Sequence, residues 1–209
     1  DLGIMTAFSI IKPGICCADI AAEGEYAMRK AGAEYVSMAP AVGRGTFYLD
    51  SAEDMSRVVA EGDMVFVDLA INVQGYLGDI TRAGIVGQGT AEQILLLDTV
   101  KKAYSVGLNQ ISSGVNGDRI YREVVKCFSQ YGWDEYFVHH LSHGLGLGND
   151  LPIISGSDSD ILAEGDVLSF EPGIYVPGVG GARIENMIHI GNRRIEELTQ
   201  CPLNLPMAI

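Results

Sequence analysis

The chain has 209 residues, 47% of them hydrophobic, and this length suits one well-packed domain or two small ones. It carries 14 basic against 27 acidic residues, a formal net charge of -13, and such a surface repels nucleic-acid phosphates and anionic lipids. No apolar run reaches the ~20 residues that span a bilayer, and the first residues lack a secretory-signal pattern. We therefore expect neither a nucleic-acid nor a membrane partner.

The cysteines indicate a reducing environment. The four are Cys16, Cys17, Cys127 and Cys201. Two are adjacent and none forms a C-x-x-C pair, so the sequence predicts neither a disulfide framework nor a zinc knuckle. A cytoplasmic protein is the expectation.

In chain order, the first predicted element is a turn followed by an amphipathic helix within residues 11–32, and it recurs 100 residues later. "IKPGICCADIAAEGEYAMRKAG" aligns with "ISSGVNGDRIYREVVKCFSQYG" at 111–132. Each copy ends at a glycine, Gly32 or Gly132, suited to a left-handed helix C-cap. In the second copy Asp118 is a plausible N-cap. The apolar positions of that helix are Ile120, Val124, Cys127, Phe128 and Tyr131.

A β-hairpin follows, from "EGDMVFVDLAIN" at 61–72 through the turn "NVQGYLG". Because strand side chains alternate between faces, Asp68 should share a face with Phe66 and Ala70. Asp79 should share a face with Thr81 on the returning strand. The turn then brings the two acids together.

The next predicted element is a helix opened by "TAEQ", in which Thr90 and Gln93 form a capping box. Its apolar residues form one stripe along the helix. They are Ile94, Leu97, Val100, Tyr104 and Leu108.

A second hairpin repeats the first at an offset of 103, with "EGDVLSFEPGIY" at 164–175 and a turn through "PGVGG". Asp68 then aligns with Glu171, and Asp79 with Glu185 after three further residues. Each half, about 1–89 and 108–209, thus combines a helix with a hairpin that carries one acid on each arm. Helices alternating with antiparallel hairpins favour an α+β fold.

The acids and histidines together predict a metal centre. A carboxylate flanked by apolar strand residues is unfavourable unless it is paired or bound to a cation. Three of the four histidines, His139, His140 and His143, cluster in "FVHHLSHGLGLGND". One imidazole plus four carboxylates can bind two Mn, Co, Fe or Zn ions. For any one acid taken alone, a solvated strand end or a salt bridge is a better explanation than a metal ligand. His189 fits an ordinary sheet position, and His140 could face away from its neighbours.

At these residues the chain resembles a known superfamily. The series "VDLAINVQGYLGDITRAG", "HHLSHGLGLGND" and "LSFEPGIYVPGVGGARIEN" is similar to the catalytic domain of methionyl aminopeptidases, Xaa-Pro peptidases and creatinase. The likeness covers essentially the whole chain and is nearest to the Xaa-Pro peptidase branch. It implies the pita-bread fold, in which duplicated halves related by a pseudo-twofold axis form a single catalytic domain over 1–209.

The resemblance also implies a ligand set and a mechanism. Asp68 would chelate one divalent ion, Asp79 and Glu185 would bridge both, and His143 and Glu171 would complete the shells, with Mn expected first and Co, Zn or Fe as alternatives. Hydrolysis by a metal-bridging hydroxide would follow, with Glu171 transferring a proton to the leaving nitrogen. His139 would steady the tetrahedral intermediate, and Arg183 would orient the bridging carboxylate.

Several positions depart from the family pattern. Asp68-Leu69-Ala70 replaces the usual Asp-x-Gly, and no histidine precedes His139, where peptidases of the family carry a substrate-facing one. A further family histidine, seven residues after the metal-binding one, corresponds to Asp150. Relatives of the Xaa-Pro and creatinase branches commonly have a separate N-terminal domain, which we expect to be missing from this chain.

Three functions remain open. The first is an Xaa-Pro-type aminopeptidase or dipeptidase, and the second is a hydrolase of a small amidine or cyclic amide, as in creatinase. The third is an inactive binding module of the same fold, which five retained ligands disfavour. Asp150 is a candidate contact for a cationic substrate group. Tyr175 is a second candidate substrate contact, although Tyr175 and Trp133 both fit packing roles better. A small C–N substrate and a homodimer are the expected partners.

Overall fold

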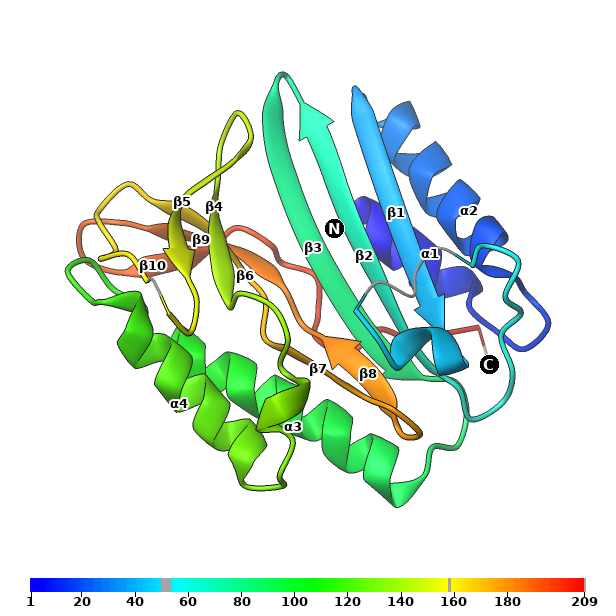
Figure 1. Cartoon of the computed structure of the whole chain (residues 1–209). Helices are drawn as coiled ribbons and strands as arrows, with labels where there is room; N and C mark the ends of the chain where they lie inside the picture. The colour runs from blue at the N-terminus through cyan, green and yellow to red at the C-terminus, as the bar shows by residue number, and fades with distance from the viewer. Residues whose placement is uncertain (50–53, 158, 209) are drawn as a thin grey trace.

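The computed structural model describes residues 1–49, 54–157 and 159–208, and Figure 1 shows its α+β architecture. Its helices are α1 (Leu2–Ile10), α2 (Cys17–Lys30), α3 (Ala91–Leu108) and α4 (Gly117–Ser129), with short 3-10 helices η1 (Gly43–Thr46) and η3 (Asp134–Tyr136). Its strands are β1 (Tyr35–Val42), β2 (Met64–Val73), β3 (Tyr76–Ile85), β4 (Ser142–Leu145), β5 (Asn149–Ile154), β6 (Val167–Phe170), β7 (Gly173–Val176), β8 (Gly180–Arg183), β9 (Asn186–Ile190) and β10 (Ile195–Glu197).

The strands form antiparallel sheets in two halves of the molecule. The first half holds a sheet in the order β1-β2-β3, covered on one side by α1 and α2. The second half holds a sheet in the order β10-β9-β6-β4-β5 and the hairpin β7-β8, with α3 and α4 packed on them. Each half has its own buried cluster: Phe8, Ile20 and Leu69 belong to the first, and Val100, Phe128 and Phe170 to the second.

The same backbone hydrogen bonds occur at matching places in both halves, which confirms the duplicated fold. The turn before α2 is closed by a bond from Gly14 N–H to Val59 O, and the turn before α4 by one from Gly114 N–H to Leu162 O. At the strand ends Gly62 N–H donates to Val86 O and Gly165 N–H to Ile190 O. Gly32 and Gly132 after the paired helices both have positive φ, +104° and +70°. The helix residues correspond at an offset of 100 and the strand residues at 103, as the aligned sequences predict, except that Val86 corresponds to Ile190 at an offset of 104.

Helix boundaries confirm some predictions and correct others. The Thr90–Gln93 capping box opens α3 as expected. The N-cap of α4 is Asn116, whose side chain accepts the N–H of Asp118, so the prediction of Asp118 as the cap was wrong by two residues. Asp118 lies in the first turn instead, where its charge is still favourable to the helix dipole.

The apolar stripes also shift at the helix ends. Ile94 is half exposed, because the buried face of α3 passes through Leu96 and Val100. Tyr131 lies beyond the end of α4 and is 43% exposed, so it is not part of the buried stripe. The central predicted positions of both helices are buried or partly buried.

The two hairpins differ in continuity. Asp68 and Asp79 lie within the unbroken strands β2 and β3. Glu171 falls in a break between β6 and β7, and Glu185 falls in a break between β8 and β9. The second hairpin is therefore not one pair of continuous strands, as the repeat predicted, but two shorter pairs that meet at the acids.

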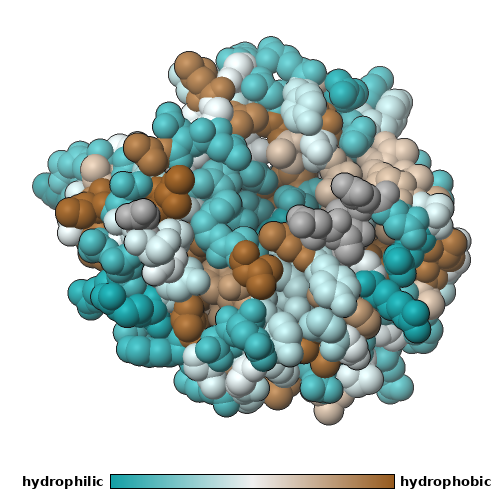
Figure 2. All heavy atoms as spheres, in the orientation of Figure 1, coloured by the Kyte–Doolittle hydropathy of each residue, from teal (hydrophilic) through white to brown (hydrophobic). Residues whose placement is uncertain are grey.

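All four cysteines are free thiols, as their spacing predicted. Within the described parts of the chain, no helix is both long and apolar enough to cross a membrane. In the orientation of Figure 1, the surface is mostly hydrophilic at the centre of the face, with separate hydrophobic patches around it (Figure 2).

Candidate metal centre

The first half supplies two acids from neighbouring strands. In the β2–β3 register Asp68 is opposite Thr81, and Asp79 is opposite Ala70. These positions share one face of the sheet, as their spacing predicted. The hairpin turn is tight because Gln74 and Gly75 adopt φ of +53° and +85°, a pair of positive values that suits a two-residue turn.

The second half brings its residues to the same place. His143 lies on β4 opposite Ser169 of β6. An isolated β-bridge joins Glu185 to Thr81 of β3, with Glu185 N–H donating to Thr81 O at 3.1 Å. The tip of the β2–β3 hairpin is also tied to the turn between β4 and β5, since Leu77 N–H donates to Gly146 O. Backbone hydrogen bonds between the halves thus fix the relative positions of the acids.

Three of the other four predicted ligands, Asp79, Glu171 and Glu185, lie close to His143. Its Nε2 lies 3.8 Å from Asp79 Oδ2 and 3.6 Å from Glu171 Oε1. The donor atoms of Asp79, His143 and Glu185 all lie within 4.8 Å of one another. Asp68 belongs to neither described three-residue donor group and joins the centre through Thr81, whose hydroxyl is 3.3 Å from Asp68 Oδ1.

Hydroxyl groups orient the most buried acid. Glu185 is 2% exposed, and its two carboxylate oxygens are each 2.5 Å from a hydroxyl, of Thr81 and of Ser169. A threonine hydroxyl carries a single proton, so Thr81 gives it to the shorter contact, with Glu185.

Arg183 connects the acids of both halves. Its guanidinium is buried and donates to Asp68, to Thr81 Oγ1 at 3.1 Å and to the Tyr175 hydroxyl at 2.7 Å. Its Nε lies 3.8 Å from both Glu171 and Glu185. Arg183 is thus placed to orient carboxylates, the position that the resemblance implied.

The predicted substrate contact at Tyr175 does not fit this arrangement. Tyr175 is 3% exposed, and its hydroxyl is occupied by Arg183 and by His139 Nε2, 3.2 Å away. Burial raises the pKa of Tyr175 to about 12, so the hydroxyl keeps its proton. Tyr175 packs behind Arg183, the alternative that its apolar surroundings had favoured.

His139 is buried beside these groups. Its Nδ1 lies 2.7 Å from the carbonyl oxygen of His140, so Nδ1 carries the proton and Nε2 accepts from Tyr175. Burial lowers the pKa of His139 to about 4, which keeps the ring neutral at physiological pH. Its Nδ1 is 3.9 Å from Glu171.

His140 does not face away from its neighbours, the alternative that the sequence had left open. Its Nε2 lies 2.8 Å from Glu171 Oε1, and it forms a second group of donor atoms with His143 and Glu171. The loop before β4 turns the ring back toward the acid. The cluster of three histidines in the sequence indicated a contact of this kind. The direction of each ring could not be predicted, because side chains in a loop do not alternate between two faces as they do in a strand.

Asp150 and His189 lie outside the cluster. Asp150 is exposed on β5, opposite Gly144, and its Oδ1 accepts the N–H of Leu151. His189 is a partly exposed residue of β9, with its Nδ1 3.9 Å from Glu196, as expected for an ordinary sheet histidine.

Electrostatics shows how crowded the carboxylates are. Burial, together with the charges of Asp68 and Glu171, raises the pKa of Asp79 to about 8. Burial and the charge of Asp79 raise the pKa of Glu185 well above its ordinary value. For Glu171 burial acts in the same direction, but the hydrogen bond from His140 and the charge of Arg183 outweigh it and lower the pKa.

These groups fit divalent cations. Carboxylates that resist ionisation when buried together are those that a bound cation stabilises in the charged form. The donor set of acids plus one imidazole suits a first-row divalent metal. The hydroxyl and guanidinium partners described above orient the acids, as surrounding groups do in metal sites.

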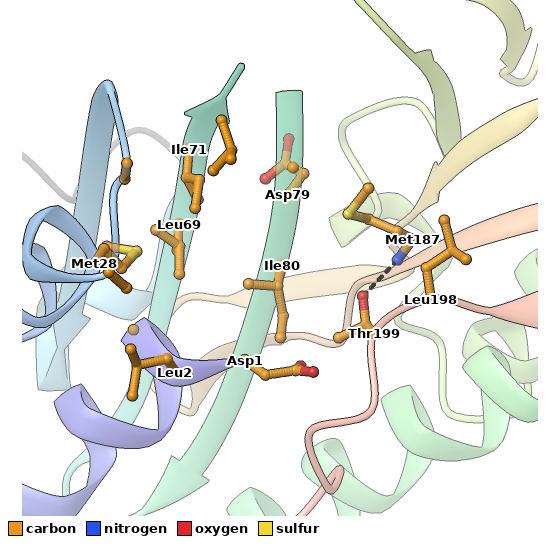
Figure 3. Close-up of a pocket in the computed structure, with 15 residues that line it drawn as sticks. Asp1, Leu2, Met28, Leu69, Ile71, Asp79, Ile80, Met187, Leu198 and Thr199 are labelled. Atoms are coloured by element: carbon orange, nitrogen blue, oxygen red, sulfur yellow. Dashed lines mark hydrogen bonds between the residues drawn. The ribbon is translucent and has the colours of Figure 1, made fainter. Parts of the chain in front are cut away.

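A separate cavity of about 240 Å³ lies behind the β1–β3 sheet (Figure 3). Leu69 and Ile80 point into it, and they are paired on the face opposite to Asp68 and Thr81. Asp79 borders this cavity, whereas His143, Glu171 and Glu185 do not line it. The cavity is therefore a mainly apolar hollow that reaches Asp79 but none of the other proposed ligands.

Comparisons with known proteins agree with this geometry. The model of metallopeptidase family M24 matches residues 1–192. The Xaa-Pro dipeptidase of Pyrococcus furiosus is 33% identical over 205 residues, covering 96% of this chain and 58% of the relative. The crystal structure of the prolidase from Pyrococcus horikoshii superposes with a TM-score of 0.92 at 32% identity, covering 97% of this chain and 59% of that one.

An X-Pro aminopeptidase from Thermotoga maritima is also similar, with a TM-score of 0.87, 32% identity and coverage of 94% of this chain and 56% of that one. The chain thus spans somewhat more than half the length of these relatives. The match over residues 1–192, the shared fold and the grouped acids lead to one conclusion: the chain belongs to metallopeptidase family M24.

Proposed function

We propose that this chain carries the catalytic centre of a hydrolase that uses two divalent metal ions to cleave a C–N bond, with an Xaa-Pro dipeptide as the first substrate class. The observation that carries the proposal is the grouping of Asp79, His143, Glu171 and Glu185 from both halves within a few ångströms of one another. Family membership and the names of the similar enzymes support it.

The proposed ligands are the five that the sequence singled out: Asp68, Asp79, His143, Glu171 and Glu185. The pKa of Asp79 and that of Glu185 are raised by burial and by neighbouring carboxylates, and bound cations would stabilise both acids in their charged form. When bound, two divalent ions supply a water of lowered pKa and polarise the carbonyl to be attacked. Mn is the first candidate, with Co, Zn and Fe as alternatives.

The residues around the ions have separate tasks in this proposal. Glu171 is ionised, because its pKa is lowered, so it can accept a proton and pass it to the leaving nitrogen. Arg183 holds Asp68 and Thr81 in place. His139, neutral with Nδ1–H, can donate a hydrogen bond when the chain binds substrate.

The substrate class rests on the relatives, two of which are described as an Xaa-Pro dipeptidase and a prolidase. Asp150 is the proposed contact for a cationic group of the substrate, such as a free amine. It is exposed and lies directly across the β4–β5 pair from Gly144, next to His143.

One observation favours a second candidate, a hydrolase of a small amidine or cyclic amide. The chain has only four histidines, none before His139, and Asp150 stands where the family pattern has another. A carboxylate at this position attracts a cationic amidine group. It offers no such attraction to a substrate that places only a neutral peptide bond there.

Purified full-length protein, reconstituted with Mn and assayed on matched substrates, tests the proposal. Xaa-Pro dipeptides, the corresponding Xaa-Ala dipeptides, small amidines and cyclic amides form the panel. Preferential cleavage of Xaa-Pro substrates supports the first candidate, and cleavage of amidines or cyclic amides alone supports the second. Metal bound without turnover of any of them would contradict both.

Asp150→Asn measures the contribution of the proposed cation contact, with Asp134→Asn, at an exposed acid, as the control. If Asp150 binds a substrate cation, its substitution raises KM for cationic substrates and leaves neutral analogues unchanged. An unchanged substrate preference would remove Asp150 from the substrate site.

A further inference from the structure

One imidazole in the centre has no part in the reaction proposed above. His140 lies on the loop before β4, with its Nε2 2.8 Å from Glu171 Oε1 and its side chain 45% exposed. At this distance the carboxylate oxygen accepts from an imidazole N–H, so Nε2 of His140 carries the proton between the two groups. Within the described part of the chain, Nδ1 of His140 has no hydrogen-bond partner.

Glu171 depends on this contact more than the other acids depend on any one partner. The remaining nitrogens near its carboxylate are those of His143, Arg183 and His139, at 3.6, 3.8 and 3.9 Å. These distances are beyond a good hydrogen bond. Among the described residues, His140 is therefore the one side chain at hydrogen-bonding distance from the Glu171 carboxylate. Glu185, by comparison, has two hydroxyl partners at 2.5 Å.

The backbone holds His140 over the acid. Glu171 N–H donates to the carbonyl oxygen of Leu141, the residue after His140, at 2.9 Å. Leu141 is buried and its own N–H donates to Ile154 O at 2.7 Å. The His140 and His143 rings have centroids 5.3 Å apart. The ring is therefore fixed at its inner edge while its outer part remains open to solvent.

We propose that His140 is a positioning residue for Glu171: its Nε2 holds Oε1 so that the carboxylate is directed at the reacting groups. The proposal rests on the proposed function, because Glu171 is there the proton carrier. The backbone of Glu171 is held by its bond to Leu141, but the direction of its carboxylate depends on side-chain partners, of which His140 is the one at hydrogen-bonding distance among the described residues.

The alternative role for His140 is that of an additional metal ligand. Its Nε2 lies within 4.8 Å of donor atoms of His143 and Glu171. A nitrogen that donates a proton to Glu171 cannot bind a cation at the same time, since metal ligation needs the deprotonated nitrogen. Metal stoichiometry separates the two roles.

Substitutions that replace one ring nitrogen at a time test the proposal. The side-chain amide of Gln reaches about as far as imidazole Nε2, whereas that of Asn reaches about as far as Nδ1. His140→Gln, His140→Asn and His140→Ala are compared with His189→Ala, which removes a partly exposed histidine that lies opposite Glu196 in the β9–β10 pair. Each variant is loaded with Mn, titrated for bound Mn by electron paramagnetic resonance, and assayed on the best substrate of the panel.

The proposal predicts an order of activities at unchanged metal content. For His140→Ala, kcat and kcat/KM fall together by about 10–100-fold, the usual effect of losing a group that orients a metal-site residue. His140→Gln retains more activity than His140→Asn, added imidazole partly restores His140→Ala, and His189→Ala behaves as the unsubstituted protein. Loss of one bound Mn in His140→Ala would show that His140 is a metal ligand. Equal activity of the Gln and Asn variants would show that Nε2 is not the atom that contacts Glu171. Either result overturns the proposal.

A measurement on metal-free protein keeps this inference separate from the proposed function. Long-range proton–nitrogen spectra of the imidazoles distinguish Nε2–H from Nδ1–H, and four histidines can be assigned with single substitutions. Above neutral pH we expect His140 in the Nε2–H form with the proton in a hydrogen bond that Glu171→Ala abolishes. An Nδ1–H form, or a spectrum unaffected by Glu171→Ala, contradicts the positioning role even if the protein proves to be an active hydrolase. If instead no metal or substrate binds, the proposed function fails, but the spectra of the metal-free protein still show whether His140 donates to Glu171.

Discussion

The four carboxylates of the centre differ in what surrounds each of them. Glu185 is enclosed by hydroxyl groups, and its pKa is raised well above the ordinary value, chiefly by burial. Asp79 is also raised, to about 8. Glu171, although buried, has a lowered pKa because of His140 and Arg183. The acid proposed to move protons is thus the one whose neighbours keep it ionised, and the proposed bridging acids are the ones that need a cation.

Glu171→Gln tests the proton-transfer role. The amide keeps the shape of the side chain and one oxygen for a metal, but it cannot accept a proton. We expect bound Mn close to that of the unsubstituted protein and a fall in kcat of about 10²–10⁴-fold, the usual range for loss of a general acid–base group. Metal analysis and steady-state kinetics measure both. Glu164→Gln, at an exposed acid of the repeated segment, is the matched control, and unchanged turnover in Glu171→Gln would remove it from this role.

The raised pKa of Asp79 predicts how the metal-free protein responds to pH. In the folded state Asp79 keeps its proton up to about pH 8, whereas the unfolded chain releases it near its ordinary pKa. The folded state then binds more protons, so its stability decreases as pH rises through this interval. Between pH 6.5 and 8 the loss is up to about 2 kcal/mol for this group. His140, whose pKa is raised by its hydrogen bond to Glu171, acts in the same direction.

Urea unfolding of EDTA-treated protein at several pH values measures this effect. Below pH 6.5 His139, whose folded pKa is about 4, acts in the opposite direction, because its imidazole binds a proton in the unfolded chain while the buried ring stays neutral. The window from pH 6.5 to 8 is therefore the informative one. Asp79→Asn should flatten the dependence in this window. A free energy of unfolding that rises with pH in metal-free protein would contradict the electrostatic description of the centre.

At the scale of secondary-structure elements, one buried cation joins β3 to β9 and to the last described segment. Arg82 is fully buried, and all five of its N–H groups have partners. The acceptors are the carbonyl oxygens of Thr81, Glu185, Cys201 and Pro202 and the side-chain oxygen of Asn186. Two of these carbonyls belong to residues of the isolated bridge that joins the halves.

Arg82→Met should therefore lower the free energy of unfolding by at least about 3 kcal/mol, because several buried acceptors lose their donor. Chemical denaturation with Arg194→Met as the exposed control measures the difference; the control should change stability by less than about 0.5 kcal/mol. A loss for Arg82→Met no greater than that of the control would show that the network adds nothing to stability.

The sequence predicted the elements whose patterns are local. Strand alternation placed Asp68 and Asp79 on one face, and the capping box placed the start of α3. The repeat located Glu171 and Glu185, but it predicted continuous strands where the structure has breaks. Alternation shows which face a residue takes within a strand, and it carries no information about where a strand bends to begin pairing with a different neighbour.

Two important side chains could not be placed from the sequence. The direction of His140 depends on a loop and on the buried backbone bonds around Leu141. Arg82 follows Thr81 in a strand and has the appearance of a solvent-facing residue, yet it is buried because the segment after β10 packs over it. Both depend on contacts between residues far apart in the chain.

At the scale of the whole molecule, the centre exists only where the two halves meet. Asp68 and Asp79 come from the first half, and His143, Glu171 and Glu185 from the second. Metal binding should therefore stabilise the chain as a unit, by about 2.7 kcal/mol per site when free metal is 100 times Kd. The net charge of -13 adds to this, because bound cations reduce the repulsion among acids.

Substitutions in opposite halves test this coupling. Asp79→Asn and Glu185→Gln should each abolish most of the stabilisation by Mn, measured as the shift of the thermal unfolding midpoint on adding metal. In metal-free protein at pH 8, Asp79→Asn should be at least as stable as the original, because it removes a crowded charge. Glu164→Gln, away from the centre, should keep the full metal effect. Stabilisation that survives both substitutions would place the metal elsewhere.

The most direct test of the account is anomalous diffraction at the Mn edge from crystals of the Mn-loaded protein. The account predicts two anomalous peaks between the halves, each coordinated by carboxylates of both hairpins, with His143 as the imidazole ligand. Peaks only at other surface acids, or a loaded crystal with no peak among residues 68, 79, 143, 171 and 185, would contradict the proposed metal centre and the hydrolysis that depends on it.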